Sequence, residues 1–315
     1  MASSTQAEPE WKFFRGMCDA SALEMLDGDL FVAANDEDNV LRVYSRKEQG
    51  FPVQSLDFTD FYRLQKKKQE IDLEGSARIG NRIYWISSHG ANAKGKFQPS
   101  RHRLFATEIV STNGVQRLAP VGRLHAHLFR DLTSAPQLAA FNLASAARRP
   151  PKTEGALNIE GLASTPEGGL LIGFRNPIPN GKALLVPLVN PLEVTEGKPA
   201  RFGAPLLLQM EGLGIRSIAL HGDEYLIVAG PYSGDESSQL YRWDGKSERP
   251  TRISPNGLAG NPEGIAVISE NQAETLFVLN DDGTEMVDDR ACKKLKDDQL
   301  KVFRGYELRL GEQPL

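Results

Sequence analysis

The sequence has little of what defines several common protein classes. It contains only two cysteines in 315 residues, Cys18 and Cys292, which are too few for a disulfide scaffold and fit no metal motif. No apolar run approaches the ~20 residues that a membrane-spanning helix needs. The first ten residues, MASSTQAEPE, have neither a basic stretch nor an apolar core, so they do not form a secretory signal. These absences predict a soluble, cytoplasmic protein with no membrane partner and with buried free thiols.

The chain also lacks an excess of basic residues. Its formal net charge is −4, which argues against a general nucleic-acid or anionic-membrane binder. Hydrophobic residues make up 40% and charged residues 25%, as expected of a globular protein with a proper core.

The motifs of several large enzyme classes are missing. There is no Gly-x-Ser-x-Gly nucleophile elbow, no glycine-rich phosphate loop and no His-Glu-x-x-His zinc motif. Serine hydrolases of the common type and phosphate-loop enzymes are therefore disfavoured, and no nucleotide or organic cofactor is indicated.

What the chain does contain is an internal repeat. Five segments share one form, a short strand, a turn and a second apolar strand that ends in polar residues; they begin at Asp19, Asp72, Asn158, Gly214 and Asn261. Each is followed by a third strand and most by a fourth, and the runs are bounded by Gly, Pro, Asn and Asp. Four-stranded antiparallel units repeated around an axis are typical of a propeller. The sequence predicts an all-β, five-bladed β-propeller in a single domain, 1–315.

The predicted blades cover 17–60, 70–124, 156–211, 213–255 and 260–310. The last unit lacks a fourth strand, so we expect 10–16 to pair with it and close the ring, which removes an exposed strand edge. An Ala- and Leu-rich stretch, 125–149, predicts a helical insertion. A sixth blade hidden in this insertion is the alternative.

Several segments carry a resemblance to a known family. The stretches FRGMCDASAL, DLEGSA, SSHG, NIEGLASTPEGGLLIGFRNP and NPEGIA resemble the domain of unknown function family 3616, over about Phe14 to Leu308. Members of that family look like propellers related to the phytase-like esterase group. By analogy, the resemblance implies metal-assisted hydrolysis of an ester or phosphoester.

Three of the first strands begin with the same pattern, an Asn or Asp, one other residue and then Glu-Gly: Asp72-x-Glu74, Asn158-x-Glu160 and Asn261-x-Glu263. In a four-stranded blade, the start of the first strand and the end of the second lie on the same face. The period of two along a strand points both polar side chains of each pair the same way. We therefore expect Glu74, Glu160 and Glu263 to be catalytic residues at one mouth of the central channel.

Crowded carboxylates need compensation, which a cation, paired arginines or retained protons can give. Ca²⁺ prefers six to eight oxygen ligands, so a calcium site is predicted from Asp19, Asp72, Glu74, Asn158, Glu160, Asn261 and Glu263. His89 ends the second strand of its blade and is a further catalytic candidate, but as a lone histidine it does not favour zinc. The alternative is structural: such acids often bind backbone amides between blades.

Basic and amide side chains are also expected at the mouth, at the start of one first strand and after two second strands. Arg175, Arg216, Lys94 and Asn176 are the predicted substrate-binding residues, and Lys94 belongs to a basic loop, GANAKGKFQPSRHR. The leading hypothesis is a metal-assisted hydrolase of a small anionic phosphoester or ester. A non-catalytic propeller that binds a ligand or protein at the mouth, and a glycoside hydrolase, remain open. We expect a monomer with no nucleic-acid partner.

Overall fold

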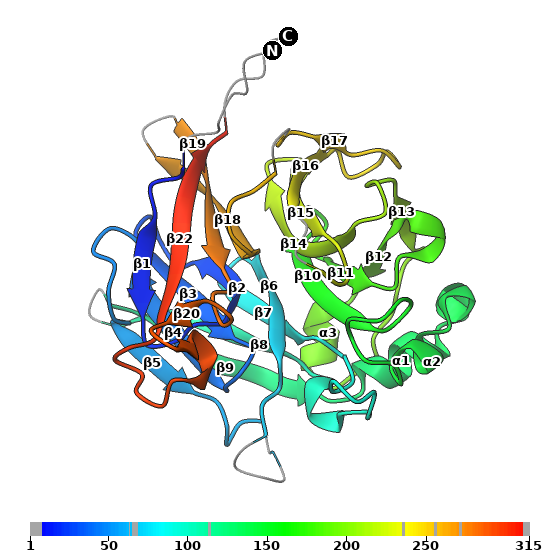
Figure 1. Ribbon diagram of the computed structural model, residues 1–315. Helices are drawn as coiled ribbons and strands as arrows, with labels where there is room; N and C mark the ends of the chain where they lie inside the picture. The colour runs from blue at the N-terminus through cyan, green and yellow to red at the C-terminus, as the bar shows by residue number, and fades with distance from the viewer. Residues whose placement is uncertain are drawn as a thin grey trace, which may run out of the picture.

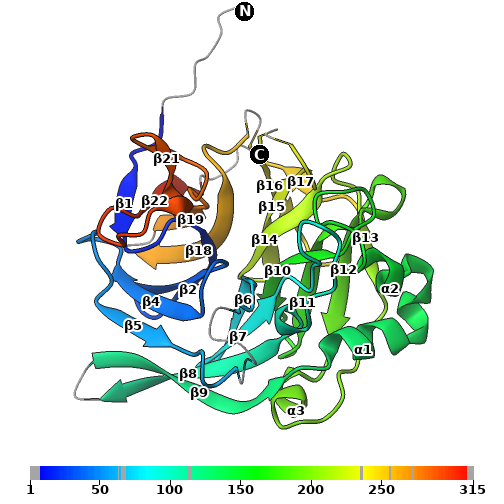
Figure 2. The same ribbon diagram turned by 60° about the horizontal axis from the view of Figure 1, so that its bottom comes forward.

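The computed structural model describes residues 8–62, 64, 69–112, 115–234, 237–254, 257–270 and 273–310. Five four-stranded antiparallel sheets are arranged around a central axis (Figures 1 and 2). The predicted five-bladed β-propeller is confirmed, and the six-bladed alternative is wrong.

The strands follow one another from the axis outward in the first four blades. Blade one contains β2 (Ala20–Met25), β3 (Leu30–Asn35), β4 (Val40–Ser45) and β5 (Gln54–Asp57). Blade two contains β6 (Leu73–Ile79), β7 (Arg82–Ser87), β8 (Leu104–Thr112) and β9 (Val115–His125). Blade three contains β10 (Asn158–Ser164), β11 (Leu170–Asn176), β12 (Ala183–Leu188) and β13 (Leu206–Leu208). Blade four contains β14 (Gly214–His221), β15 (Glu224–Gly230), β16 (Gln239–Trp243) and β17 (Thr251–Arg252).

The fifth blade is built from both ends of the chain. Its order is β18 (Pro262–Glu270), β19 (Ala273–Asn280), β22 (Val302–Arg309) and β1 (Lys12–Arg15). β1 pairs with β22 in antiparallel register, with Phe14 opposite Phe303. The Phe14 ring is fully buried and lies 5.3 Å from the Phe303 ring and 5.1 Å from the Phe31 ring of blade one. The predicted closure of the ring is confirmed.

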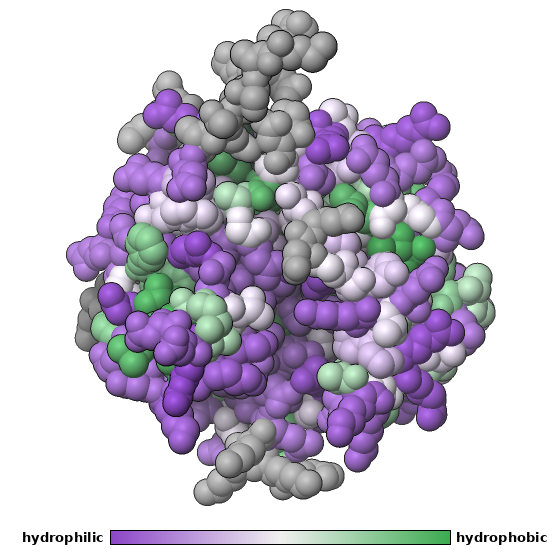
Figure 3. All heavy atoms as spheres, viewed as in Figure 1, coloured by the Kyte–Doolittle hydropathy of each residue, from purple (hydrophilic) through white to green (hydrophobic). Residues whose placement is uncertain are grey.

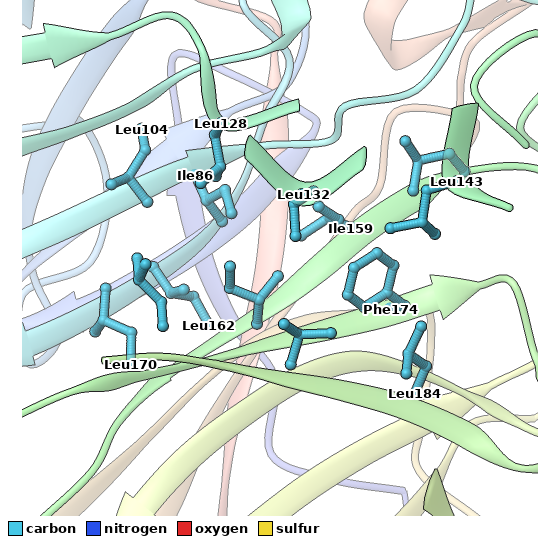
Figure 4. Packing of buried hydrophobic residues seen from close by; sticks show 14 of the residues in the cluster. Ile86, Leu104, Leu128, Leu132, Leu143, Ile159, Leu162, Leu170, Phe174 and Leu184 are labelled. Atoms are coloured by element: carbon cyan, nitrogen blue, oxygen red, sulfur yellow. The ribbon is translucent and has the colours of Figure 1, made fainter. Parts of the chain in front are cut away.

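The hydrophobic cores lie between neighbouring blades. The largest joins blades two and three and takes in Ile86, Leu104, Ile159 and Phe174 (Figure 4). The predicted helical insertion packs onto this core as α1 (Leu128–Ser134), η2 (Pro136–Phe141) and α2 (Leu143–Ala146). The remaining short elements lie in connecting segments: η1 (Pro99–Arg101), η3 (Pro179–Gly181), α3 (Pro191–Thr195), β20 (Met286–Val287), β21 (Arg290–Ala291) and η4 (Cys292–Lys294). None of the helices in the described ranges has the length and apolar character needed to cross a membrane.

The expectation of two free thiols is wrong. Cys18 and Cys292 form a disulfide across 274 positions of sequence. Cys18 lies just before β2 and Cys292 lies in the segment between β19 and β22, so the bond joins blade one to blade five. The pair escapes sequence reasoning because only the closed ring brings the two ends of the chain together. Blades one and five are thus held together by two isolated β-bridges, Phe14 with Gly50 and Asp19 with Asp281, by aromatic packing and by a covalent bond.

The closing strand offers a direct test. Phe14→Ala should lower the free energy of unfolding by about 3–5 kcal/mol, the usual cost of removing a buried aromatic ring. Phe13→Ala, one residue away on a side chain that is 49% exposed, should change it by less than about 0.5 kcal/mol. Urea unfolding of the two variants measures the difference. Equal, small effects would contradict the role of β1 in closing the ring.

Candidate functional site

The innermost strands carry an irregularity that positions the site. Each of β2, β6, β10, β14 and β18 shifts register against its neighbour close to its start. The residues left over by these shifts include Glu74, Glu160, Arg216 and Glu263. A β-bulge of this kind re-aims the extra side chain. The charged residues are therefore placed by bulges, and not by the plain alternation of a strand that the sequence suggested.

The glycine after each glutamate allows neighbouring blades to approach closely, because it has no side chain. A Cβ on Gly161 would lie 2.7 Å from Cγ2 of Ile215, and one on Gly264 would lie 3.0 Å from Cβ of Leu23. A Cβ on Gly75 would come within 3.1 Å of the carbonyl oxygen of Glu160. The Glu-Gly repeat thus combines a charge at the bulge with a close approach to the next inner strand.

One side of the mouth is a buried network of ion pairs. Nη1 of Arg175 lies 2.8 Å from Oε1 of Glu160, which also accepts a 2.7 Å hydrogen bond from Nδ2 of Asn158. Arg216 forms an ion pair with Glu263, and its Nε lies 3.8 Å from Oε2 of Glu160. Each of these residues is at least nine-tenths buried. The expectation that both arginines reach the glutamates is confirmed.

Glu74 belongs to a second group. One carboxylate oxygen from each of Asp36, Asp72 and Glu74 lies within 4.8 Å of the other two. Asp72 accepts a hydrogen bond from the Ser88 hydroxyl and lies 3.0 Å from Nη1 of Arg101. Glu74 is only 9% exposed, yet within the described ranges its carboxylate has no hydrogen bond or ion pair. We call Asp36, Asp72 and Glu74 the acidic triad.

Burial disfavours the charged form of these acids. It is the main cause that raises the pKa of Asp72 to about 6 and that of Glu263 to about 8. It also raises the pKa of Glu74 and of Asp36 well above their ordinary values, and neighbouring carboxylates add to both shifts. Without a cation, the mouth therefore retains protons at neutral pH.

A third group lies where blades one and five meet. Asp281 accepts hydrogen bonds from the Gly283 amide at 2.8 Å and from Nδ2 of Asn261 at 3.2 Å. Asp19 pairs with Asp281 in a β-bridge. Nζ of Lys293 lies 3.9 Å from Oδ1 of Asp19. Burial, followed by the charge of Asp281, raises the pKa of Asp19 to about 7.

A cavity of about 260 Å³ runs between the inner strands. Glu74 and Glu160 line it, and so do Glu24 near the end of β2 and Arg78 near the end of β6. Hydrophilic side chains cover much of the face seen in Figure 3, which is hollowed near its centre.

Other predicted site residues have different surroundings. The His89 ring donates from Nδ1 to the carbonyl oxygen of Ser87 at 2.8 Å and lies 5.1 Å from the His102 ring. Burial lowers its pKa to about 4. Asn176 donates to the carbonyl oxygens of Pro151 and Thr153, and Lys94 is exposed in the loop after β7. Among the residues that the structure describes, none of these three side chains forms a hydrogen bond or ion pair with the carboxylates of the mouth, and their catalytic or binding roles stay predictions.

Three participants lie outside the predicted set of site residues, although Asp36 and the basic loop of Arg101 were expected on the same face. Asp36 is absent from the predicted ligand set, although it directly follows the second strand of blade one. Arg101 lies at η1, far along a loop, and Lys293 depends on the disulfide for its place. A ligand search restricted to the Glu-Gly repeat could not have found them.

Comparisons with known proteins fit this architecture. The family model described as "Protein of unknown function (DUF3616)" matches residues 19–117 and 116–295. The chain belongs to this family. No curated protein matches the chain.

Solved structures resemble this DUF3616 protein only distantly. Glutaminyl cyclase from Myxococcus xanthus is 12% identical, with 96% of each chain covered and a TM-score of 0.47. A GH43 β-1,3-galactosidase is 9% identical over 93% of this chain and 90% of that one, with a TM-score of 0.48. A PQQ-bound aldose sugar dehydrogenase from Streptomyces coelicolor is 10% identical, with 96% and 99% covered and a TM-score of 0.43. At such low identity, no activity is inferred from these likenesses.

The buried acids predict a pH dependence of stability. Burial raises the pKa of Glu24, which lines the same cavity, to about 8 in the folded protein from an ordinary value of 4.5, so folding takes up a proton between these values. Stability then falls as pH rises through that window, by up to about 1.4 kcal/mol per pH unit for one group. His89 has the opposite effect on stability. Because its pKa is lowered on folding, stability is lost as pH falls from 6.5 toward 4, and His89 adds little to the pH dependence above 6.5.

The test is urea unfolding in chelator between pH 6.5 and 8. The wild-type free energy of unfolding should fall across this range, and Glu24→Gln should make the fall shallower. Glu154→Gln, at an exposed position, should leave the slope unchanged. Identical slopes in all three proteins would contradict the assignment of a proton to Glu24.

Proposed function

We propose that the protein is a metal-assisted hydrolase that cleaves an ester or phosphoester of a small anionic molecule at the channel mouth. The observation that carries the proposal is the acidic triad, with three carboxylate oxygens within 4.8 Å of one another. Glu74, buried and without a partner among the described residues, supports a missing cation more strongly than a cluster of exposed acids would.

The charge balance of the mouth supports a cation. Arg175 and Arg216 are engaged by Glu160 and Glu263, and Arg101 contacts only Asp72 of the triad. When they ionise, Asp36 and Glu74 have no matching ion pair in the described part of the chain. Carboxylate oxygens suit a hard divalent cation. Ca²⁺ fits best, because it accepts oxygen ligands in a flexible geometry.

The same pairing changes the roles first expected of the basic residues. Because both buried arginines are held by glutamates, neither is free to bind a substrate anion without breaking an ion pair, which is costly when buried. Arg101 also forms ion pairs, with Glu70 at 2.6 Å and with Asp72 at 3.0 Å, but its side chain is 21% exposed, so rearranging these pairs costs less than breaking a buried one. A bound cation would polarise the substrate oxygen and lower the pKa of a bound water. Arg101 would hold the anionic group next to it.

The Cys18–Cys292 bond bears on where this site works. Disulfides form and persist in oxidising compartments. We therefore propose an oxidising location. The cytoplasmic expectation, which depended on the lack of a signal sequence and of a membrane-spanning run, has this observation against it.

Cation binding can be measured without a known substrate. After chelation, Ca²⁺ at about a hundred times its dissociation constant should stabilise the wild type by about 2.7 kcal/mol. Glu74→Gln keeps the shape but removes a ligand charge, so it should weaken calcium affinity at least about tenfold and lose about 1.4 kcal/mol of this gain. Glu24→Gln, which changes a carboxyl elsewhere in the same cavity, should keep the full gain. Calorimetric titration and thermal unfolding report both quantities.

Hydrolysis is tested separately with chromogenic carboxyl esters, phosphomonoesters and phosphodiesters. The proposal expects turnover of at least one class that requires a divalent cation and falls about a hundredfold or more in Glu74→Gln. Cation binding with no turnover of any class would favour the binding propeller instead. If calcium changes the stability of neither the wild type nor the variants, the proposed metal site is wrong.

A further inference from the structure

The segment between β19 and β22 is weakly anchored to the propeller. Over Thr284–Leu300, Cys292 is the one buried residue, and the strands β20 and β21 have two residues each. A short two-stranded hairpin is marginally stable without further support. The disulfide to Cys18 is therefore a principal attachment of this segment.

The attachment places a cation at the mouth. Lys293 follows Cys292, and its Nζ lies 3.5 Å from Oε1 of Glu37 and 3.9 Å from Oδ1 of Asp19. Its backbone amide donates to the carbonyl oxygen of Gly283 at 3.0 Å. The carboxylate of Asp19 packs so closely on Gly283 that any side chain there would overlap it. The segment thus docks on the residue next to Cys18, with its ammonium group turned toward the acids.

This ammonium group is electrically linked to the acidic triad. Burial lowers the pKa of Lys293, but the charges of Asp19, Glu37 and Asp36 raise it and the net shift is upward. Asp36 is itself a triad member, and Asp19 is among the charges that act on it. A fixed positive charge within reach of the triad opposes the entry of a divalent cation.

We propose that the Cys18–Cys292 disulfide controls cation affinity at the channel mouth by holding Lys293 against Asp19 and Glu37. This inference depends on the cation site of the proposed function. While the disulfide is intact, Lys293 acts as an internal counter-cation. Reduction releases the segment, removes this charge from the mouth and strengthens binding of the divalent cation.

The redox step needs a dithiol as reductant. The disulfide accepts two electrons and two protons, the bond between the two sulfurs breaks, and Cys18 and Cys292 become thiols. The dithiol becomes a disulfide in turn. No other group of the protein changes oxidation state.

The affinity of Ca²⁺ is the first readout, measured by calorimetry on the oxidised and the dithiothreitol-reduced protein. Reduction should tighten binding by about three- to tenfold, the size expected for removing one partly screened charge. Lys293→Met should tighten binding of the oxidised protein to a similar degree, and reduction of that variant should add little. Lys294→Met, at the exposed neighbouring position, should behave as the wild type. An equal effect of reduction in wild type and Lys293→Met would overturn the role of Lys293.

Amine acetylation is the second readout and needs no cation. Mass spectrometry should show that reduction speeds acetylation of Lys293 several-fold, while that of Lys294 changes little. If both lysines keep their rates on reduction, the segment is held without the disulfide and the inference is wrong. If reduction releases Lys293 but neither the wild type nor any variant binds Ca²⁺, the cation site of the proposed function is wrong. Control of cation affinity by the disulfide is then wrong too, although the release of the segment on reduction is still shown. Calcium binding that is unaffected by reduction overturns the inference alone.

Discussion

The desolvation of carboxylates at one mouth of the channel is the constraint on which the rest of the site depends. Glu74, Glu160 and Glu263 are each at least nine-tenths buried, where an isolated charge is strongly disfavoured. The protein meets this constraint in two ways. Arginines on the neighbouring strands neutralise Glu160 and Glu263. Within the described ranges no arginine forms an ion pair with Glu74, and together with Asp36 and Asp72 it forms the group of acids that a bound cation would stabilise most.

The propeller makes this arrangement possible by repetition. Every inner strand shifts register near its start, so equivalent side chains from all blades meet around one axis. The same position holds Glu in three blades and Arg in blade four, which turns a repelling ring into a partly balanced one. Ring closure by β1 and the disulfide keeps blades one and five in place, and with them Asp19, Asp36 and Lys293.

The sequence was sufficient for the fold and for part of the site. The repeated strand pairs predicted five blades, the unpaired N-terminal strand predicted the closure, and the Glu-Gly repeat predicted three carboxylates at one mouth. The register shifts could not be predicted, because alternation along a strand carries no signal for a bulge. The Cys18–Cys292 bond and the position of Lys293 depend on contacts between distant parts of the chain, and Asp36 shares no motif with its partners in the triad.

The central claim is that the acidic triad binds a divalent cation. A crystal structure of the protein grown with Mn²⁺ or Tb³⁺ tests it most directly, since anomalous scattering locates these ions without reference to the rest of the density. The account predicts one peak between Asp36, Asp72 and Glu74, at roughly 2–2.6 Å from an oxygen of each. A mouth with no anomalous peak under saturating metal, or an ion bound only elsewhere on the propeller, would contradict it.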